Sequence, residues 1–208
     1  MHDASNTIAE FVKATAARTP TPGGGSVAAL VGALAAALGE MVVQYSIGKK
    51  GLEAFEPELK PALAELQRAR EMLMGLMVED QLAYEALSAV RKLPPDSQER
   101  REKYAPALLA CIRVPESVAA TGVCVLELCD RLVGFANPHL LSDLAVCADL
   151  SMAAIRCAVY NVRTNLKDVQ DAEDRRRIEQ TVGSILERAV RLIQNVTPRI
   201  WERESQET

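Results

Sequence analysis

The sequence predicts an all-α protein, an antiparallel bundle of about six mostly long helices that forms a homodimer. Apolar residues recur at helical spacing along almost the whole chain, and no segment alternates as a half-buried strand does. Alanine and leucine dominate while aromatic residues make up only 4%, which favours helices packed through small side chains. The connectors are short, as in antiparallel bundles. We expect residues 1–208 to form one helical domain.

Helix breakers divide the apolar pattern into six helical segments. Pro94 and Pro95 end the third segment, while Pro106 and Pro115 predict a break or kink in the fourth. The six segments cover about residues 5–18, 26–47, 57–92, 98–133, 141–166 and 171–202.

The second segment has no large polar face. Ala28, Gly32 and Ala36 lie among small residues on several sides, so this helix must be surrounded by other helices. A homodimer surrounds it more easily than a single bundle of this size. Residues 27–47 are apolar enough to raise the question of a membrane span. Because Glu40 and Gln44 lie inside the run, we interpret it as a buried helix of a soluble bundle.

Composition argues against several classes of function. The net charge of -4 disfavours nucleic-acid binding, and nothing indicates a membrane role. His2 and His139 are the only histidines, without a Glu-x-x-His pair or a Cys/His cluster, so we expect no metal site. The five cysteines lie in apolar segments without a Cys-x-x-Cys motif, which indicates buried thiols in a reducing compartment, the cytoplasm.

Three consecutive glycines precede the second helix. Ordering them costs backbone entropy, so we expect them to permit a close approach of the backbone to a ligand or to another helix. Ser26 is expected to cap the helix. The free N–H groups of the first turn and the positive helix end favour a carboxylate or a carbonyl-rich ring. Gly23, Gly24, Gly25 and Ser26 are therefore candidate ligand-binding residues.

Two further candidate segments lie at helix ends. Lys49 and Lys50 follow the second helix, where they either complement its negative end beside Gly48 or place the Lys49 ammonium beside an apolar pocket. Desolvation in such a pocket suits a lysine to proton transfer. Ser142 and Asp143 open the fifth helix, a position at which both are typical capping residues.

Two polar pairs lie inside helices. Asp80 and Tyr84 are one turn apart on an otherwise apolar face, so Asp80 is either solvated or lines a pocket. Asn161 and Asn165 are also one turn apart. Asparagine lowers helix propensity, and when buried it needs polar partners or the edge of a ligand.

Taken in order, these segments resemble the cyclodeaminase/cyclohydrolase family. That family includes the cyclodeaminase half of formiminotransferase-cyclodeaminase and the stand-alone bacterial methenyltetrahydrofolate cyclohydrolases. The resemblance implies an all-helical homodimer that binds reduced folates with neither metal nor cofactor. It rests on Pro22-Gly23-Gly24-Gly25-Ser26, Ile47-Gly48-Lys49-Lys50, Asp80-x-x-x-Tyr84, Leu93-Pro94, Val114-Pro115, Ser142-Asp143 and Asn161-Val162-x-x-Asn165.

The resemblance also implies chemistry at the carbon that bridges folate N5 and N10. A cyclohydrolase adds water to the cationic methenyl bridge and gives 10-formyltetrahydrofolate, whereas a cyclodeaminase joins N10 to an N5-formimino carbon and releases ammonia. On this basis Lys49 carries protons, Asp143 steadies the bridge or orients water, and Asp80 is a second carboxylate.

Substrate contacts follow from the same resemblance. Lys50 would attract the glutamate tail, and the asparagines would meet the pterin edges. Since no formiminotransferase domain accompanies this sequence, we expect a cyclohydrolase; a cyclodeaminase and an inactive folate-binding dimer are the alternatives. The glycine loop, Lys49 and Asp143 must then share one cleft, within a chain or between chains. The implied binding residues are Gly23, Gly24, Gly25, Ser26, Lys50, Tyr84, Ser142, Asn161 and Asn165.

Overall fold

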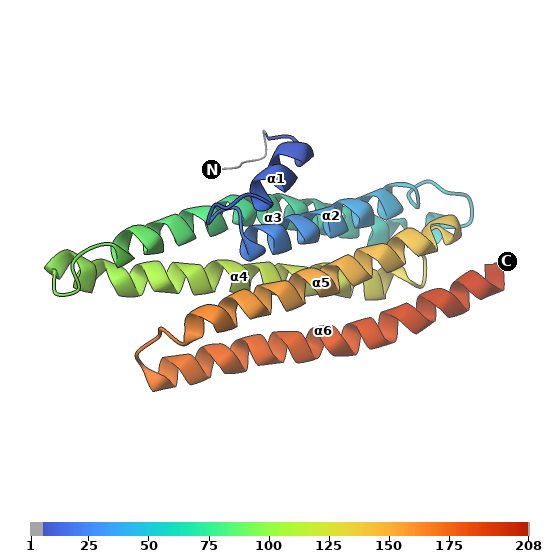
Figure 1. The fold of residues 1–208 in the computed structure, drawn as a ribbon. Helices are drawn as coiled ribbons and strands as arrows, with labels where there is room; N and C mark the ends of the chain where they lie inside the picture. The colour runs from blue at the N-terminus through green and yellow to red at the C-terminus, as the bar shows by residue number, and fades with distance from the viewer. Residues whose placement is uncertain (1–5, 208) are drawn as a thin grey trace.

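The protein is a bundle of long helices with one short helix laid across it (Figure 1). The computed structural model describes residues 6–207, so His2 and the first residue of the predicted helix 5–18 lie outside the described part. The helices are α1 (Ile8–Thr15), α2 (Gly24–Gln44), α3 (Glu56–Arg91), α4 (Gln98–Leu132), α5 (Leu141–Leu166) and α6 (Ala172–Glu207), with short 3-10 turns η1 (Glu53–Phe55) and η2 (Pro138–Leu140).

The predicted all-α class is confirmed, with two corrections to the segments. α1 is shorter than predicted, and it starts later because Thr7 is its N-cap. The Thr7 hydroxyl accepts a hydrogen bond from the Glu10 N–H at 3.2 Å, and the Glu10 carboxylate accepts one from the Thr7 N–H. The predicted break in the fourth helix is wrong, because α4 continues through Pro106 and Pro115. Packing along its length against α3 and α5 compensates for the lost backbone hydrogen bonds.

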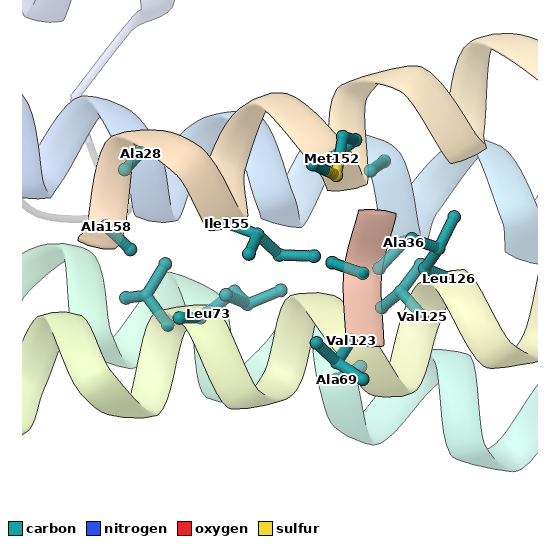
Figure 2. Packing of buried hydrophobic residues seen from close by; sticks show 14 of the residues in the cluster. Ala28, Ala36, Ala69, Leu73, Val123, Val125, Leu126, Met152, Ile155 and Ala158 are labelled. Atoms are coloured by element: carbon teal, nitrogen blue, oxygen red, sulfur yellow. The ribbon is translucent and has the colours of Figure 1, made fainter. Parts of the chain in front are cut away.

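Small residues let α2 lie at the centre of the bundle. It packs against both α3 and α5, which in turn pack against α4, while α6 covers the outside of α4 and α5 (Figure 1). Figure 2 shows Ala28 and Ala36 of α2 among the larger side chains of the core, including Leu73 and Ile155. A Cβ at Gly32 would come within 3.1 Å of Leu73 Cδ2, so the close contact between α2 and α3 depends on that glycine.

α2 and α5 run antiparallel, which defines two ends of the bundle. Asn161, near the end of α5, lies beside Gly24 at the start of α2. Asn137, just before α5, donates to the carbonyl of Tyr45 at 3.2 Å. We call the first region the glycine end and the second, with residues 45–51 and 137–143, the lysine end. The 21 residues of α2 separate the two ends by about 30 Å.

One face of α2 is apolar and largely open, although α1 lies beside its start, where Val27 and Leu30 line a hollow together with Phe11 and Val12. Leu34, at the middle of the helix, is 50% exposed, and Tyr45 at its end is 65% exposed. No residue of this face is charged. We call it the α2 stripe: Val27, Leu30, Val31, Leu34, Ala37, Leu38, Met41 and Tyr45.

The charged residue inside α2 points into the bundle. Glu40 is 7% exposed, and the Arg70 guanidinium of α3 donates to its carboxylate at 2.6 Å. By length and composition α2 and α4 are apolar enough to cross a membrane, yet more than half of each apolar window is buried inside the bundle.

Candidate active site

A cavity of about 200 Å³ opens at the glycine end. Four separate parts of the chain line it, namely the glycine loop, α3, α4 and α5. A larger hollow of about 770 Å³ lies over residues 171–180, but one short stretch of chain forms it and no candidate residue lines it. The cavity at the glycine end is lined by Pro20, Thr21, Gly23, Gly24, Gly25, Asp80, Tyr84, Leu87, Arg91, Cys111, Asn161 and Asn165.

The Asp80 carboxylate lies against the first turn of α2. The Ser26 hydroxyl donates to Asp80 Oδ2 at 2.8 Å, and the Ser26 backbone N–H donates to the same carboxylate. Burial raises the pKa of Asp80, and the two hydrogen bonds from Ser26 oppose this shift without cancelling it. Asp80 is therefore a stronger base than an ordinary aspartate and is held at the positive end of the α2 dipole.

The expected capping role of Ser26 is wrong. The helix begins two residues earlier, its N-cap is Gly23, and no side chain caps it locally. Ser26 is the third residue of the helix and hydrogen bonds to Asp80 of α3 instead. A carboxylate of another helix thus accepts the hydrogen bond from the first turn of α2 that the side chain of the N-cap residue accepts in most helices.

The glycines of the loop serve two different purposes. A Cβ at Gly25 would overlap the Asp80 carboxylate, so packing alone requires glycine there. A Cβ at Gly24 would meet Asn161 at 3.4 Å and one at Gly23 would meet the Pro20 carbonyl at 3.6 Å, both ordinary contacts. Gly23 and Gly24 instead expose backbone to the cavity.

The two asparagines of α5 both reach the cavity. Asn161 Nδ2 donates to the Cys157 carbonyl at 2.8 Å, and Asn165 Nδ2 donates to the carbonyls of Cys111 and Asn161 at 3.1 Å each. Within the described residues, no hydrogen bond is donated to the Oδ1 atom of either side chain. These two oxygens can therefore accept hydrogen bonds from a ligand.

The remaining candidates lie at the lysine end. Lys49 follows α2 in a turn where Gly48 and Gly51 have φ of 72° and 90°, values that favour glycine. Lys49 and Asp143 are half-buried, whereas Lys50 and Ser142 are exposed. None of these four lines the cavity. The expected convergence of the glycine loop, Lys49 and Asp143 therefore does not occur within one chain.

Comparison with known proteins identifies the family. Residues 7–184 match the family model described as formiminotransferase-cyclodeaminase. The chain belongs to this family. Over 88% of its length it is 31% identical to a methenyltetrahydrofolate cyclohydrolase of Methylorubrum extorquens, covering 90% of that protein.

Other similar proteins carry the cyclodeaminase name. The chain is 33% identical to the formimidoyltransferase-cyclodeaminase of Gallus gallus over 88% of this chain but only 34% of that protein. It thus spans about a third of such relatives. A solved formiminotetrahydrofolate cyclodeaminase from Thermotoga maritima superposes with a TM-score of 0.82 at 30% identity, covering 97% of each chain.

Two ionisable side chains of this family member's cavity, those of Cys111 and Arg91, escaped the sequence analysis. Cys111 belongs to the apolar pattern of α4, and burial together with the Asp80 charge raises the pKa of its thiol. Arg91 ends α3, where a basic residue is expected merely to complement the helix dipole. Its spacing was a usable signal, because Asp80, Tyr84, Leu87 and Arg91 follow one face of a helix.

Proposed function

We propose that the protein is a methenyltetrahydrofolate cyclohydrolase that hydrolyses 5,10-methenyltetrahydrofolate to 10-formyltetrahydrofolate. The observation that carries this proposal is the half-buried Asp80 carboxylate, whose pKa is raised, in the wall of a cavity. A carboxylate in that setting can both attract a cationic carbon and accept a proton from water. The match to the Methylorubrum extorquens cyclohydrolase over 90% of that protein supports the same reaction.

The proposed reaction requires one base and one route for a second proton. As the water oxygen bonds to the bridge carbon, Asp80 takes one water proton, and the cationic charge of the bridge is neutralised. The second water proton moves to N5 as the bond between N5 and the bridge carbon breaks. The formyl group remains on N10, and the proton held by Asp80 is released to solvent.

Other residues of the cavity would bind and orient the substrate. The Oδ1 atoms of Asn161 and Asn165 would accept hydrogen bonds from pterin N–H groups. The backbone at Gly23 and Gly24 would allow the ring to approach closely. Tyr84, which is 41% exposed on α3, would contact the substrate at the cavity wall.

We further propose that two chains pair through the α2 stripe in antiparallel orientation. A two-fold axis near Leu34, the midpoint of α2, would place Tyr45 of one chain over Gly23 of its partner, since each lies 11 residues from Leu34. Lys49 and Lys50 would then lie near the Asp80 carboxylate in the cavity of the partner, a pairing of opposite charges. The exposed part of the apolar stripe, with Leu34 and Tyr45, would be buried between the two α2 helices.

This pairing would complete the site from two chains. The lysine end of one chain would then face the cavity of the other. In that arrangement Lys49 is the proposed carrier of the second water proton. Asp143 would orient the attacking water, and Ser142 and Lys50 would lie at the border of the site. The two ends need not converge within a chain for all candidates to serve one reaction.

An optical assay tests the proposed activity. Added protein should accelerate the loss of methenyltetrahydrofolate absorbance well above the spontaneous rate, in proportion to protein concentration. The Asp80→Asn chain serves as the control for contaminating activity, because it retains the shape of the side chain. Loss of absorbance at the spontaneous rate would contradict the cyclohydrolase proposal.

The second candidate function is that of a formiminotetrahydrofolate cyclodeaminase. The superposition on the Thermotoga maritima enzyme over 97% of each chain favours it. In the same assay, a cyclodeaminase should generate methenyl absorbance from 5-formiminotetrahydrofolate and release ammonia. A protein that binds tetrahydrofolate by calorimetry yet accelerates neither reaction would be an inactive folate-binding protein.

A mixing experiment tests the two-chain site. Asp80→Asn and Lys49→Met chains should each be nearly inactive alone. When they are co-expressed, half of the dimers are mixed, and one of their two sites has both residues intact. We therefore expect about a quarter of wild-type activity. Absence of any recovery in verified mixed dimers would show that the two residues do not meet across the interface.

A further inference from the structure

Charges of opposite sign lie at two points along the α3 wall of the cavity. Asp80 and Arg91 are 11 residues apart, almost three full turns, and both line the cavity together with Tyr84 and Leu87 between them. Among the described residues that line this cavity, Arg91 is the one cationic side chain and Asp80 the one anionic side chain. The wall is therefore polarised along the axis of α3.

The proposed substrate carries the complementary charges in the matching order. Its methenyl bridge is cationic, and its glutamate tail carries carboxylates beyond an aromatic ring and an amide. Eleven residues of helix span about 16 Å between Cα atoms, and the reach of an arginine side chain shortens the gap between the charged groups to about 10–13 Å. Ordinary bond lengths place the tail carboxylates about 10–13 Å from the bridge carbon when the tail is extended.

The guanidinium of Arg91 is held in place but not enclosed. Arg91 Nη2 donates to Asp168 Oδ2 of the loop between α5 and α6 at 2.7 Å, and both side chains are partly exposed. An exposed pair of this kind is weak enough to be shared with another anion. The Tyr104 side chain also hydrogen bonds to Arg91, and the N–H groups of the guanidinium fork that neither partner takes suit a second carboxylate.

Its neighbour Arg100 is committed to a structural role. Its Nη1 donates to the carbonyl oxygens of Arg91 and Leu93 at 3.2 and 2.9 Å, and its guanidinium lies 5.9 Å from the centre of the Tyr104 ring. These contacts fix the turn that follows α3. Arg100 thus positions the backbone of Arg91 and leaves anion binding to Arg91 itself.

We propose that Arg91 binds a carboxylate of the glutamate tail and thereby orients the substrate along α3. The inference rests on the proposed function and adds to it a direction of binding. The bridge carbon lies at Asp80, and the tail extends toward the C-terminal end of α3. Arg91 takes over the tail-binding role that the sequence analysis gave to Lys50, which lies at the opposite end of α2.

Binding measurements with two probes test this assignment without requiring turnover. Tetrahydrofolate carries the glutamate tail, and tetrahydropteroate lacks it. By calorimetry we expect the wild type to bind tetrahydrofolate about 10- to 100-fold more tightly, as expected for a charge-assisted hydrogen bond. Arg91→Met should lose this preference while its affinity for tetrahydropteroate stays within about twofold of wild type.

Two further variants keep the test specific. Arg163→Met removes a comparably exposed arginine, paired with Glu179, that does not line the cavity, and should leave both affinities unchanged. Arg91→Lys keeps the charge but not the fork, so it should retain part of the preference. Circular dichroism spectra matching wild type would show that each variant is folded.

The outcomes separate this inference from the proposed function. If Arg91→Met keeps the full preference for tetrahydrofolate, or if the wild type shows none, the Arg91 assignment is overturned while cyclohydrolase turnover stands on its own assay. If Lys50→Met alone abolishes the preference, the tail binds at the lysine end of a partner chain. If the wild type binds neither probe and accelerates neither folate reaction, both the assignment and the proposed function fail.

Discussion

The two ends of α2 are built in contrasting ways. At the glycine end, three long helices meet around Asp80, and side chains of α3 and α5 close a cavity around the start of α2. At the lysine end, backbone contacts such as that of the Asn137 N–H with the Ser46 hydroxyl at 2.8 Å tie a turn in place, while Lys50 extends into solvent. One end encloses a cavity and the other presents charge to solvent, a difference that the proposed two-chain site would explain.

The largest expected effect comes from removing the Asp80 charge at the glycine end. We expect Asp80→Asn to lower kcat by about 10³-fold, because the proposed general base is lost while the side-chain shape is kept. Glu79→Gln, an exposed neighbour on the same helix, is the matched control and should be within twofold of wild type. Steady-state kinetics at saturating substrate measure both. Near-normal kcat in Asp80→Asn would mean that the base lies elsewhere.

A smaller but still large effect should follow from separating the ends of two chains. Leu34→Lys places like charges at the proposed two-fold axis, so the dimer should dissociate and kcat should fall about 10²-fold as the partner's lysine end leaves the cavity. Trp201→Lys alters an apolar side chain on α6 that is at least as exposed as Leu34, and this variant should remain dimeric. Sedimentation measures the state of assembly.

Sedimentation of the wild-type chain tests the same pairing. A wild-type chain that sediments as a monomer at micromolar concentration would contradict the α2 pairing. Flotation of the protein with lipid vesicles would assign the α2 stripe to a membrane surface instead.

Adjacent glycines at the enclosed end should respond differently to the same change. Gly25→Ala introduces a Cβ into the space of the Asp80 carboxylate, and we expect a loss of about 1–3 kcal/mol in the free energy of unfolding. Gly24→Ala meets only Asn161 at an ordinary distance and should be neutral or stabilising by up to about 1 kcal/mol. Urea denaturation of the two variants checks the difference; equal stabilities would show that Asp80 moves aside freely.

The smallest effect concerns the pH dependence of stability. Because burial raises the pKa of Asp80 in the folded state, the folded chain holds this proton more tightly than the unfolded chain. Wild-type stability is therefore lost as the pH rises from the ordinary aspartate range through the raised pKa. The Asp80→Asn chain lacks this loss, so its stability relative to wild type should increase across that window and level off above it. Thermal unfolding at a series of pH values would reveal a flat difference if Asp80 were unperturbed.

Helical periodicity was sufficient to predict the fold and one side of the site. Asp80 and Tyr84 were found because their phase places polar groups on an apolar face, and the structure puts both on the cavity. The same spacing extends to Arg91, which was overlooked because a basic residue at a helix end already has a local explanation. A residue that already has a local role in its helix can thus be missed as a residue of the site.

The errors arose where contacts distant in sequence replace local ones. Ser26 has the residue type of a cap, but the partner of its hydroxyl is 54 positions away. Pro115 is a residue that usually breaks a helix, but it is buried within α4, which packs against both α3 and α5. The predicted length of the second helix, in contrast, already implied that Lys49 and the glycine loop are about 30 Å apart within one chain.

The fit of Asp80 over Gly25 couples the histories of two positions. A line of descent that acquires a larger residue at position 25 loses stability as long as it keeps the acid at position 80, whereas a line without the acid has space for that residue. We therefore expect substitutions at the two sites to accumulate together. Relatives that carry alanine at the position of Gly25 should be those in which the ancestral catalysis has been abandoned or rebuilt.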